Sequence, residues 1–227
     1  AEGVREHTAA LSGAMNERFM DLIQWLLRGQ IDFDLVSESL LAELYDGGKK
    51  GFGVGQMEYQ VVLVPPLLTI RATTLKALAE FLGRGGRVIV TGKAPACVDG
   101  QISGEAQALY EQAENAAFLE TDILDALREE RQLAIYGQCG ERRRDLLYQM
   151  RREGEKRWLF IAHCDPPQRV DGRDCAGDRL RIVVKGAYRP TLYDTMSGEI
   201  RPLPGRIKNG NTIFSVCCHT LDSFLFL

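Results

Sequence analysis

The sequence lacks the features that would place it in several common classes of protein. No apolar run approaches the ~20 residues that span a bilayer, and the chain does not open with a charged and then apolar signal segment. Its 28 Lys and Arg do not outnumber its 31 Asp and Glu, and the net charge is −3. A nucleic-acid-binding domain normally has a basic surplus. We therefore expect neither a membrane nor a nucleic acid among its partners.

The cysteines lack the spacing of a metal or redox motif. No CxxC pair exists, which disfavours a zinc ribbon and a thioredoxin-type site. Disulfide frameworks are typical of short secreted chains with little core, whereas a chain of 227 residues can bury a large one. We therefore expect free thiols in a reducing compartment, the cytoplasm. The cysteines are Cys97, Cys139, Cys164, Cys175, Cys217 and Cys218.

Neither end of the sequence resembles a usual terminus. The chain starts with Ala1-Glu2-Gly3 and not with Met, and it stops directly after the apolar run 223–227. Natural termini are usually polar. We therefore expect a segment of a longer polypeptide, with processing or a natural end as the alternatives.

The first part of the chain alternates helical and strand patterns. Apolar residues recur at three- and four-residue spacing over 14–27, which predicts a helix that ends at Gly29. Residues 31–36 alternate apolar and acidic side chains before an apolar pair, and they predict a short strand. Ser37 or Ser39 can then cap a second helix.

The alternation continues through the next hundred residues. The nearly continuous apolar run 59–64 is typical of a parallel strand that is covered on both faces. A helix that begins near Thr73 and stops at the glycines of 83–86 leads to the strand 88–90. Residues 103–133 are helical in composition.

From Arg144 onward the pattern is that of short strands. Explicit turns separate them, and Asn209-Gly210 is the strongest hairpin indication in the chain. Short strands with regular turns are typical of an antiparallel sandwich. The predicted strands cover 147–151, 158–162, 180–184, 191–193 and 212–216.

We therefore predict an α/β domain followed by a β domain. Residues 1–140 would form a doubly wound, flavodoxin-like sheet, because helices and strands alternate along them. Residues 141–227 would form an antiparallel β-sandwich, with the boundary near 137–141.

Two glycine-rich segments resemble phosphate-binding loops only superficially. A dinucleotide-binding loop has GxGxxG spacing and joins a strand to a helix. The segment 51–55 instead precedes a strand and is followed by Gln56, and the glycines of 83–86 follow a helix as a C-cap does. We interpret the first as a tight loop and the second as a helix-ending turn.

Cys97 is a candidate nucleophile. Class I glutamine amidotransferases share a doubly wound sheet and carry a nucleophilic cysteine on a sharp strand-to-helix turn. Cys97 follows Pro95-Ala96 without the glycines of such a turn. None of the three histidines, His7, His163 and His219, has an assignable role as its base. We do not assign catalysis to Cys97, and a cysteine-dependent enzyme remains an alternative.

The pairs His163-Cys164 and Cys217-Cys218-His219 could supply soft metal ligands. Adjacent residues of a strand point to opposite faces, so at most alternate members can converge on one ion. We interpret them as strand residues that pack or lie at an edge.

The remaining charged residues show no pattern that singles out a site. A glycosidase needs two carboxylates at a defined separation, and no pair here stands out. Arg142-Arg143-Arg144 and Arg151-Arg152 are interleaved with glutamates, which favours a salt-bridged face over a phosphate track. The carboxylates considered are Asp32, Asp34, Glu38, Asp99, Asp122, Asp194 and Glu199.

Several segments together resemble a known family. The run GQIDFDLVSE at 29–38 is followed by YQVVLVPP at 59–66 and GGRVI at 85–89. These segments resemble the amidotransferase-like α/β domain that follows the catalytic barrel in several bacterial glycoside hydrolases. Such hydrolases include family 42 β-galactosidases and larger rhamnosidase-like and family 2-like proteins. RWLFIAH at 157–163 and the hairpin 192–203 resemble the β-sandwich beside that domain.

The resemblance implies a fold of the class I glutamine amidotransferase type without its catalytic cysteine. It also implies that the catalytic acid and nucleophile lie on a barrel that this chain lacks. We therefore assign no catalytic, cofactor-binding or metal-binding residue and no cofactor. The sequence departs from the family in having no apolar strand within 1–14.

The expected function is that of a non-catalytic accessory part of a glycoside hydrolase. It would brace the barrel of the same polypeptide, shape the edge of its cleft through the loops 47–55 or 92–100, or mediate self-association, as the domain does in family 42. The alternative is a free-standing carbohydrate-binding or interaction module. Against that alternative, aromatic residues make up only 8% of the chain, and Trp25 and Trp158 fall on apolar runs that predict core positions.

Overall fold

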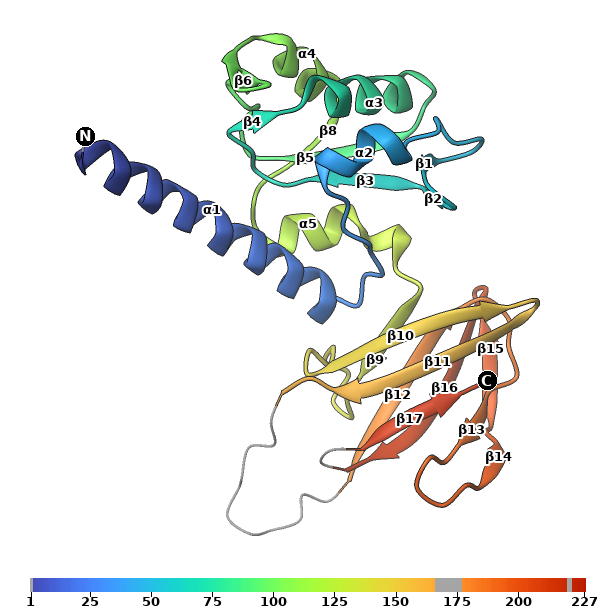
Figure 1. The fold of residues 1–227 in the computed structure, drawn as a ribbon. Coiled ribbons are helices and arrows are strands. Elements are labelled where there is room, and N and C mark those ends of the chain that lie inside the picture. The colour runs from blue at the N-terminus through green and yellow to red at the C-terminus, as the bar shows by residue number, and fades with distance from the viewer. Residues whose placement is uncertain (1, 166–176, 220–221) are drawn as a thin grey trace. The chain divides into compact units, whose positions relative to one another are not determined.

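The computed structural model describes residues 2–165, 177–219 and 222–227, with side chains from residue 9 onward. The fold is mixed α/β with several sheets (Figure 1). The chain groups into two compact units, of which unit 1 contains Ala1–Gln24 and Asp34–Ala126. Unit 2 contains Trp25–Phe33 and Leu127–Leu227. The predicted domains, 1–140 and 141–227, would each fold independently. That division remains a prediction.

The first helix, α1 (Glu2–Arg28), ends in a Schellman motif. The Gln30 amide donates to Leu27 O at 3.1 Å and the Ile31 amide to Leu26 O at 3.0 Å. The left-handed residue of the motif is Gln30, with φ 58°, and not the expected Gly29. No helix in the described part of the chain is both long and apolar enough to cross a membrane.

Gln30 adopts this conformation because tertiary contacts hold its side chain. The side chain is fully buried, its Nε2 donates to Arg143 O at 2.8 Å, and its Oε1 accepts from the Ile135 amide at 3.0 Å. A left-handed non-glycine residue costs about 1–2 kcal/mol, and two hydrogen bonds of about 0.5–1.5 kcal/mol each offset that cost. Gln30 and both of its partners belong to unit 2, so these bonds stabilise the turn after α1 within that unit.

The strand expected at 31–36 is not present. Residues 31–37 have no strand partner, and Leu35 and Val36 are 60% and 45% exposed. The alternating pattern is present in the sequence, but a strand also needs a neighbouring strand edge to pair with. Ser37 does cap the helix that follows, through its hydroxyl and the Ser39 amide.

Unit 1 contains three small sheets and four further helices among its described residues. The strands β3, β5 and β8 form a parallel sheet in that order, β4, β6 and β7 form a second sheet, and β1 and β2 form a hairpin. The helix predicted over 103–133 is interrupted, because residues 114–116 pair with β5. The elements are α2 (Glu38–Leu44), β1 (Phe52–Val54), β2 (Met57–Tyr59), β3 (Val61–Val64), β4 (Thr69–Ile70), α3 (Ala72–Gly83), β5 (Arg87–Thr91), β6 (Cys97–Val98), β7 (Gln101–Ile102), α4 (Glu105–Gln112), β8 (Glu114–Ala116) and α5 (Glu120–Ala126).

The core of unit 1 lies between the parallel sheet and its helices. Val88 and Val90 of β5 are at most 1% exposed and belong to one cluster with Leu78 and Phe81 of α3. Phe52 completes the cluster with an edge-to-face contact to Phe81 at 5.4 Å between ring centroids. Continuous apolar burial along β5 is what a parallel strand covered on both faces requires.

Unit 2 contains two antiparallel sheets that share one hydrophobic core. Their strand orders are β10-β11-β17-β13-β14 and β15-β16-β12-β9, and residues from both sheets form the core cluster. The elements are a 3₁₀ turn (Arg128–Glu130), β9 (Leu133–Tyr136), β10 (Leu146–Glu153), β11 (Lys156–His163), β12 (Asp178–Lys185), β13 (Thr191–Tyr193), β14 (Ile200–Pro202), β15 (Gly205–Lys208), β16 (Asn211–Cys218) and β17 (Ser223–Phe226).

The turn at Asn209-Gly210 is confirmed. Both residues have positive φ, 50° and 74°, and Lys208 pairs with Asn211 across the hairpin. The strand β9 pairs with β12 through Ile135 and Ile182, so a segment that precedes residue 141 belongs to a sheet of unit 2. Sequence pattern alone did not indicate this pairing, because it joins segments far apart in the chain.

Candidate functional site

Titratable side chains gather at one end of the unit 2 core. Asp145 directly precedes β10, His163 ends β11, Asp178 begins β12 and Cys218 ends β16. Strand alternation turns His163 to the same side as the buried Leu159 and Ile161, and Cys218 to the same side as the buried Val216. With Arg143, these side chains form the His163 cluster: Arg143, Asp145, His163, Asp178 and Cys218.

Arg143 is the centre of the His163 cluster. It donates to both carboxylate oxygens of Asp145, at 2.8 and 2.6 Å, and it also pairs with Asp178. These bonds join the segment that leads into β10 of one sheet to the first residue of β12 in the other. The bidentate bond from Arg143 lowers the pKa of the Asp145 carboxyl below its ordinary value, more than burial raises it.

Cys218, His163 and Asp145 lie in the order of a nucleophile, a base and an orienting carboxylate. Cys218 Sγ is 3.4 Å from His163 Nε2, and His163 Nδ1 is 3.5 Å from Asp145 Oδ2. Catalysis would require the Cys218 thiolate. Cys218 is only 4% exposed, and burial raises the pKa of its thiol to about 11. The thiol is therefore protonated at neutral pH. The burial of the His163 cluster favours a structural role, in which its side chains bind one another at the end of the core, over the role of a nucleophile.

The other members of the predicted metal-ligand set do not converge. Cys164 Sγ contacts Arg144 O at 3.8 Å, whereas Cys217 Sγ lies 3.9 Å from His219 Nε2. Cys217 and His219 are alternate residues of one chain segment, and only two of the proposed ligands come together there. Within residues 2–165, 177–219 and 222–227, no group of three or more His, Cys, Asp or Glu side chains could hold a metal ion.

The cysteine chemistry of the described residues is that of free thiols. Cys97, Cys139, Cys164, Cys217 and Cys218 form no disulfide. Cys175, the sixth, lies outside the described residues.

Cys97 begins β6 in unit 1, and unit 1 by itself contains no histidine among the side chains that the structure describes. The described histidine side chains, His163 and His219, belong to unit 2. The geometry therefore offers no support for a cysteine nucleophile at this position.

The glycine-rich segment 51–55 is a tight hairpin, as predicted. A Cβ on Gly51 would lie 2.6 Å from Tyr59 O, and one on Gly53 would lie 2.8 Å from the Gly48 backbone. The nearby amides of Lys49 and Lys50 donate to the Glu58 carboxylate, at 2.5 and 3.3 Å. These two amides are therefore already bound by a carboxylate of the chain itself.

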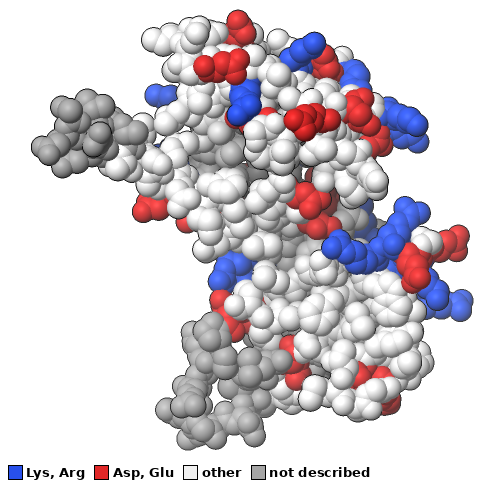
Figure 2. Space-filling view, in the orientation of Figure 1, with Lys and Arg blue, Asp and Glu red and all other residues white. Residues whose placement is uncertain are grey.

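Two of the carboxylates and two of the arginines considered above make contacts within the fold. Asp99 accepts from the Ala72 amide at the start of α3, and Asp194 accepts from the amides of its own turn. Arg143 is bound within the His163 cluster, and Arg152 donates to Gly154 O at 3.0 Å. Figure 2 shows basic and acidic side chains interspersed on the face that it presents. Arg143 is therefore salt-bridged, as expected for its run, whereas the contact of Arg152 is to a backbone oxygen.

A groove of about 280 Å³ lies between α3 and α4 in unit 1. Its lining contains no imidazole, thiol or pair of carboxylates, so it offers no set of catalytic groups. The lining residues are Ala72, Leu75, Lys76, Ala79, Glu105, Ala108, Leu109 and Gln112.

The core positions predicted for the two tryptophans are wrong, because Trp25 and Trp158 are both only half-buried. Trp158 alternates along β11 with the buried Leu159 and Ile161. Its indole contacts Tyr193 edge to face, at 5.3 Å between ring centroids. An apolar run such as 158–162 hides the two-residue period, and the neighbouring strands were needed to tell its two faces apart.

The structure resembles solved glycoside hydrolases. No protein-family model matches the chain, and no curated protein matches its sequence. A rhamnosidase from Novosphingobium sp. PP1Y has a TM-score of 0.62 and 17% identity, over 85% of this chain and 19% of the rhamnosidase. Alpha-L-fucosidase isoenzyme 2 from Paenibacillus thiaminolyticus has a TM-score of 0.55 and 12% identity, over 92% of this chain and 44% of the fucosidase.

A GH42 exo-carrageenase from Bacteroides ovatus has a TM-score of 0.40 and 6% identity, over 83% of this chain and 26% of that enzyme, which is too weak to indicate a shared fold. The chain thus spans about a fifth of the rhamnosidase and less than half of the fucosidase. At these identities the likeness concerns the fold. The fold is coarsely that of glycoside hydrolase domains.

Proposed function

We propose that this chain is a non-catalytic accessory part of a glycoside hydrolase. The observation that carries the proposal is the asymmetry of the structural likeness: 85% and 92% of this chain are matched, but only 19% and 44% of the two hydrolases. Most of each hydrolase therefore has no counterpart here. The described carboxylates Asp99, Asp145 and Asp194 are engaged in caps, turns and ion pairs, which agrees with an accessory role.

The finer fold that we propose is a flavodoxin-like, amidotransferase-like α/β domain followed by a β-sandwich. The parallel order β3-β5-β8 supports the first part, and the shared core of two antiparallel sheets supports the second. We propose the catalytic barrel of the same polypeptide as the main partner, which this chain would brace or whose cleft it would shape. Self-association and a cytoplasmic location belong to the same proposal, with neither nucleic acid nor membrane as a partner.

The test compares the 227-residue chain with the polypeptide encoded by its complete reading frame. Both are assayed for hydrolysis of a panel of aryl glycosides that includes rhamnosides, fucosides and galactosides. The proposal predicts hydrolysis by the complete polypeptide and none by the 227-residue chain. Hydrolysis by the chain alone would contradict it, and so would a complete polypeptide that hydrolyses none of the panel.

A further inference from the structure

The outer face of the five-stranded sheet in unit 2 carries an apolar row. The strand register places Gln149 opposite Phe160, Phe160 opposite Leu225, Leu225 opposite Tyr193, and Tyr193 opposite Ile200. Residues opposite one another on neighbouring strands project from the same face of a sheet. Four apolar or aromatic side chains therefore cross the sheet in one line.

This row faces away from the core. The neighbouring residues Leu159, Ile161 and Leu192, which point to the other side, are at most 6% exposed and belong to the core cluster. By contrast, Phe160 is 41% and Ile200 60% exposed. An apolar face that is left open on a folded unit marks a binding surface more often than a scattered exposed residue does.

Trp158 extends the row into an aromatic platform. It lies two residues before Phe160 on β11 and contacts Tyr193 edge to face, at 5.3 Å and 62°. Its Nε1 donates to Glu153 Oε2 at 2.9 Å, which fixes the orientation of the indole. We call Trp158, Phe160 and Tyr193 the aromatic platform. Fixed rings are suited to binding, because few rotamers are lost when a ligand stacks on them.

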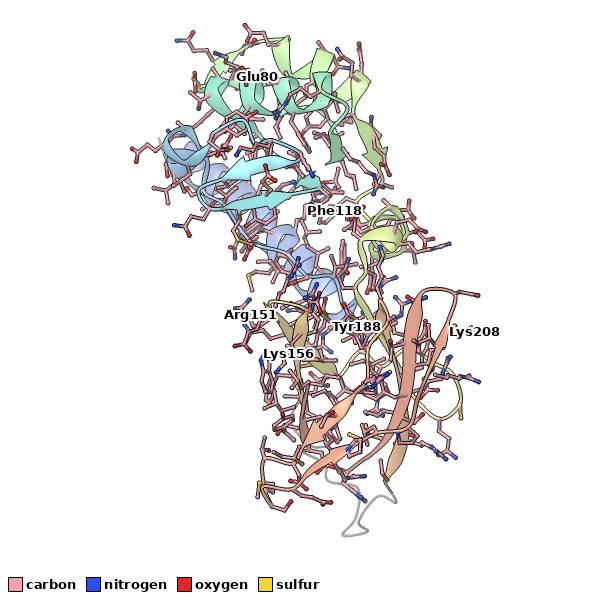
Figure 3. The ribbon with its side chains drawn as sticks, turned by 90° about the vertical axis from the view of Figure 1, so that its right-hand side faces the viewer. Glu80, Phe118, Arg151, Lys156, Tyr188 and Lys208 are labelled. Atoms are coloured by element: carbon pink, nitrogen blue, oxygen red, sulfur yellow. The ribbon has the colours of Figure 1, made fainter. Side chains whose placement is uncertain are left out.

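Basic and amide groups border the aromatic platform. Arg151 lies opposite Trp158 on the neighbouring strand, Gln149 lies opposite Phe160, and Lys156 projects from β11 on the same face. All three are exposed. Figure 3 shows Arg151 and Lys156 on the β10–β11 hairpin. Glu153, which lies opposite Lys156 in the register and accepts the Trp158 hydrogen bond, keeps its negative charge. The two cations Arg151 and Lys156 therefore stand against this one carboxylate on the outward-facing positions of β10 and β11.

We propose that the aromatic platform binds an acidic glycan built of pyranose units. The apolar C–H face of a pyranose ring stacks on an aromatic ring, while its equatorial hydroxyls accept and donate hydrogen bonds at the edge. Arg151 and Lys156 complement carboxylate or sulfate groups on the glycan. The inference rests in part on the proposed function, because a part of a carbohydrate-active enzyme meets such ligands.

The test is a titration of the 227-residue chain that carries Trp25→Phe, so that Trp158 is the one tryptophan reporter. The probes are oligogalacturonate, a sulfated galactan oligosaccharide and the neutral galactan oligosaccharide of equal length. The proposal predicts a saturable change in tryptophan fluorescence with at least one acidic probe. It also predicts binding about tenfold weaker with the neutral one, since two cationic contacts are lost. Equal binding of neutral and acidic probes, or no binding of any, overturns the proposal.

Variants separate the platform from the rest of the surface. Binding is followed by calorimetry, and Phe160→Ala and Tyr193→Ala should each weaken it about tenfold or more. The matched control is Phe19→Ala, another exposed aromatic residue that lies on α1 and not on this sheet. Thermal unfolding of each variant is measured, so that misfolding is not counted as lost binding. Unchanged binding in both folded platform variants overturns the proposal.

The failures of the two proposals can be told apart. Hydrolysis by the complete polypeptide together with no glycan binding by the chain overturns this inference alone. Glycan binding by the chain together with no hydrolysis by the complete polypeptide overturns the accessory function alone. Binding by the chain that is absent in the complete polypeptide means that another domain covers the platform, and that result also overturns the inference.

Discussion

Two regions of unit 2 reverse the usual distribution of polar and apolar groups. The His163 cluster places charged side chains at the end of the core, and the aromatic platform places rings on an outer face. The first is closed, because Arg143 binds both Asp145 and Asp178. The second is open, because Phe160 is 41% exposed and faces away from the core. Buried polar groups with partners stabilise a fold, whereas an open apolar face is available to a ligand.

Removal of Arg143 should have the largest effect on stability. Arg143→Ala leaves the half-buried carboxylates of Asp145 and Asp178 without their cation, which costs about 2–4 kcal/mol of unfolding free energy. Urea unfolding measures it. The control is Arg152→Ala, at an exposed position of β10, which should change stability by less than about 0.5 kcal/mol. Equal urea midpoints for both variants would mean that the cluster does not hold the sheets together.

Thiol labelling tests whether the His163 cluster is chemically inert. Because burial raises the pKa of the Cys218 thiol to about 11, its thiolate is scarce at pH 7.5. Cys218 should react with iodoacetamide on the order of 100-fold more slowly than an ordinary exposed cysteine. The exposed Cys139 and Cys217 serve as internal references. Peptide mapping of the labelled chain gives the order in which the cysteines react. Labelling of Cys218 faster than of Cys139 and Cys217 would support the interpretation of Cys218 as a nucleophile.

Acid should reduce the difference between the wild type and Arg143→Ala. The pKa of Asp145 is lowered below its ordinary value of 3.8, first by its hydrogen bonds with Arg143. A carboxyl whose pKa falls on folding stabilises the fold above its unfolded pKa, and that contribution is lost as the pH falls through the folded pKa. The gap in urea midpoint should therefore be constant from pH 5 to 7 and shrink below about pH 4. A gap that grows in acid would assign the stability to another group.

Substitution on the aromatic platform should have the smallest effect on folding. Phe160→Thr keeps a residue with high strand propensity and removes a ring that is 41% exposed. The expected loss of unfolding free energy is about 1 kcal/mol or less. Thermal unfolding checks it. A loss as large as that of Arg143→Ala would mean that the outer face is needed for stability and would erase the contrast between the two regions.

Local chemistry was sufficient to predict several elements. The Ser37 cap, the Asn209-Gly210 hairpin and the helix-ending glycines near 85 are encoded within a few residues, and the structure has all three. The tight loop at 51–55 is also encoded locally, because its closely packed backbone leaves no room for a Cβ at Gly51 or Gly53.

Long-range pairing limited the other predictions. The strand expected at 31–36 has the right alternation but no partner edge, and residues 114–116 form a strand because β5 lies beside them. The left-handed Gln30 depends on Ile135 and on Arg143, more than a hundred residues away in sequence. No local pattern contains that information.

The site was predicted least well, for the same reason. Alternation limits which members of the His163 and Cys218 motifs can meet, but the approach of those two residues requires the register of several strands. Trp158 was placed in the core because its run is apolar throughout. The two-residue period becomes visible only when Leu159 and Ile161 are known to be buried.

The most direct test of the contrast between the two regions is a set of ¹H–¹⁵N spectra of the chain, recorded with and without an acidic pyranose oligosaccharide. We expect the Trp158 indole resonance and the amides of Phe160 and Tyr193 to shift in a saturable manner, while the amides of His163 and Cys218 do not. Shifts that gather at His163 and Cys218 and leave Trp158 unchanged would contradict this expectation, because the ligand would then occupy the region that the structure closes.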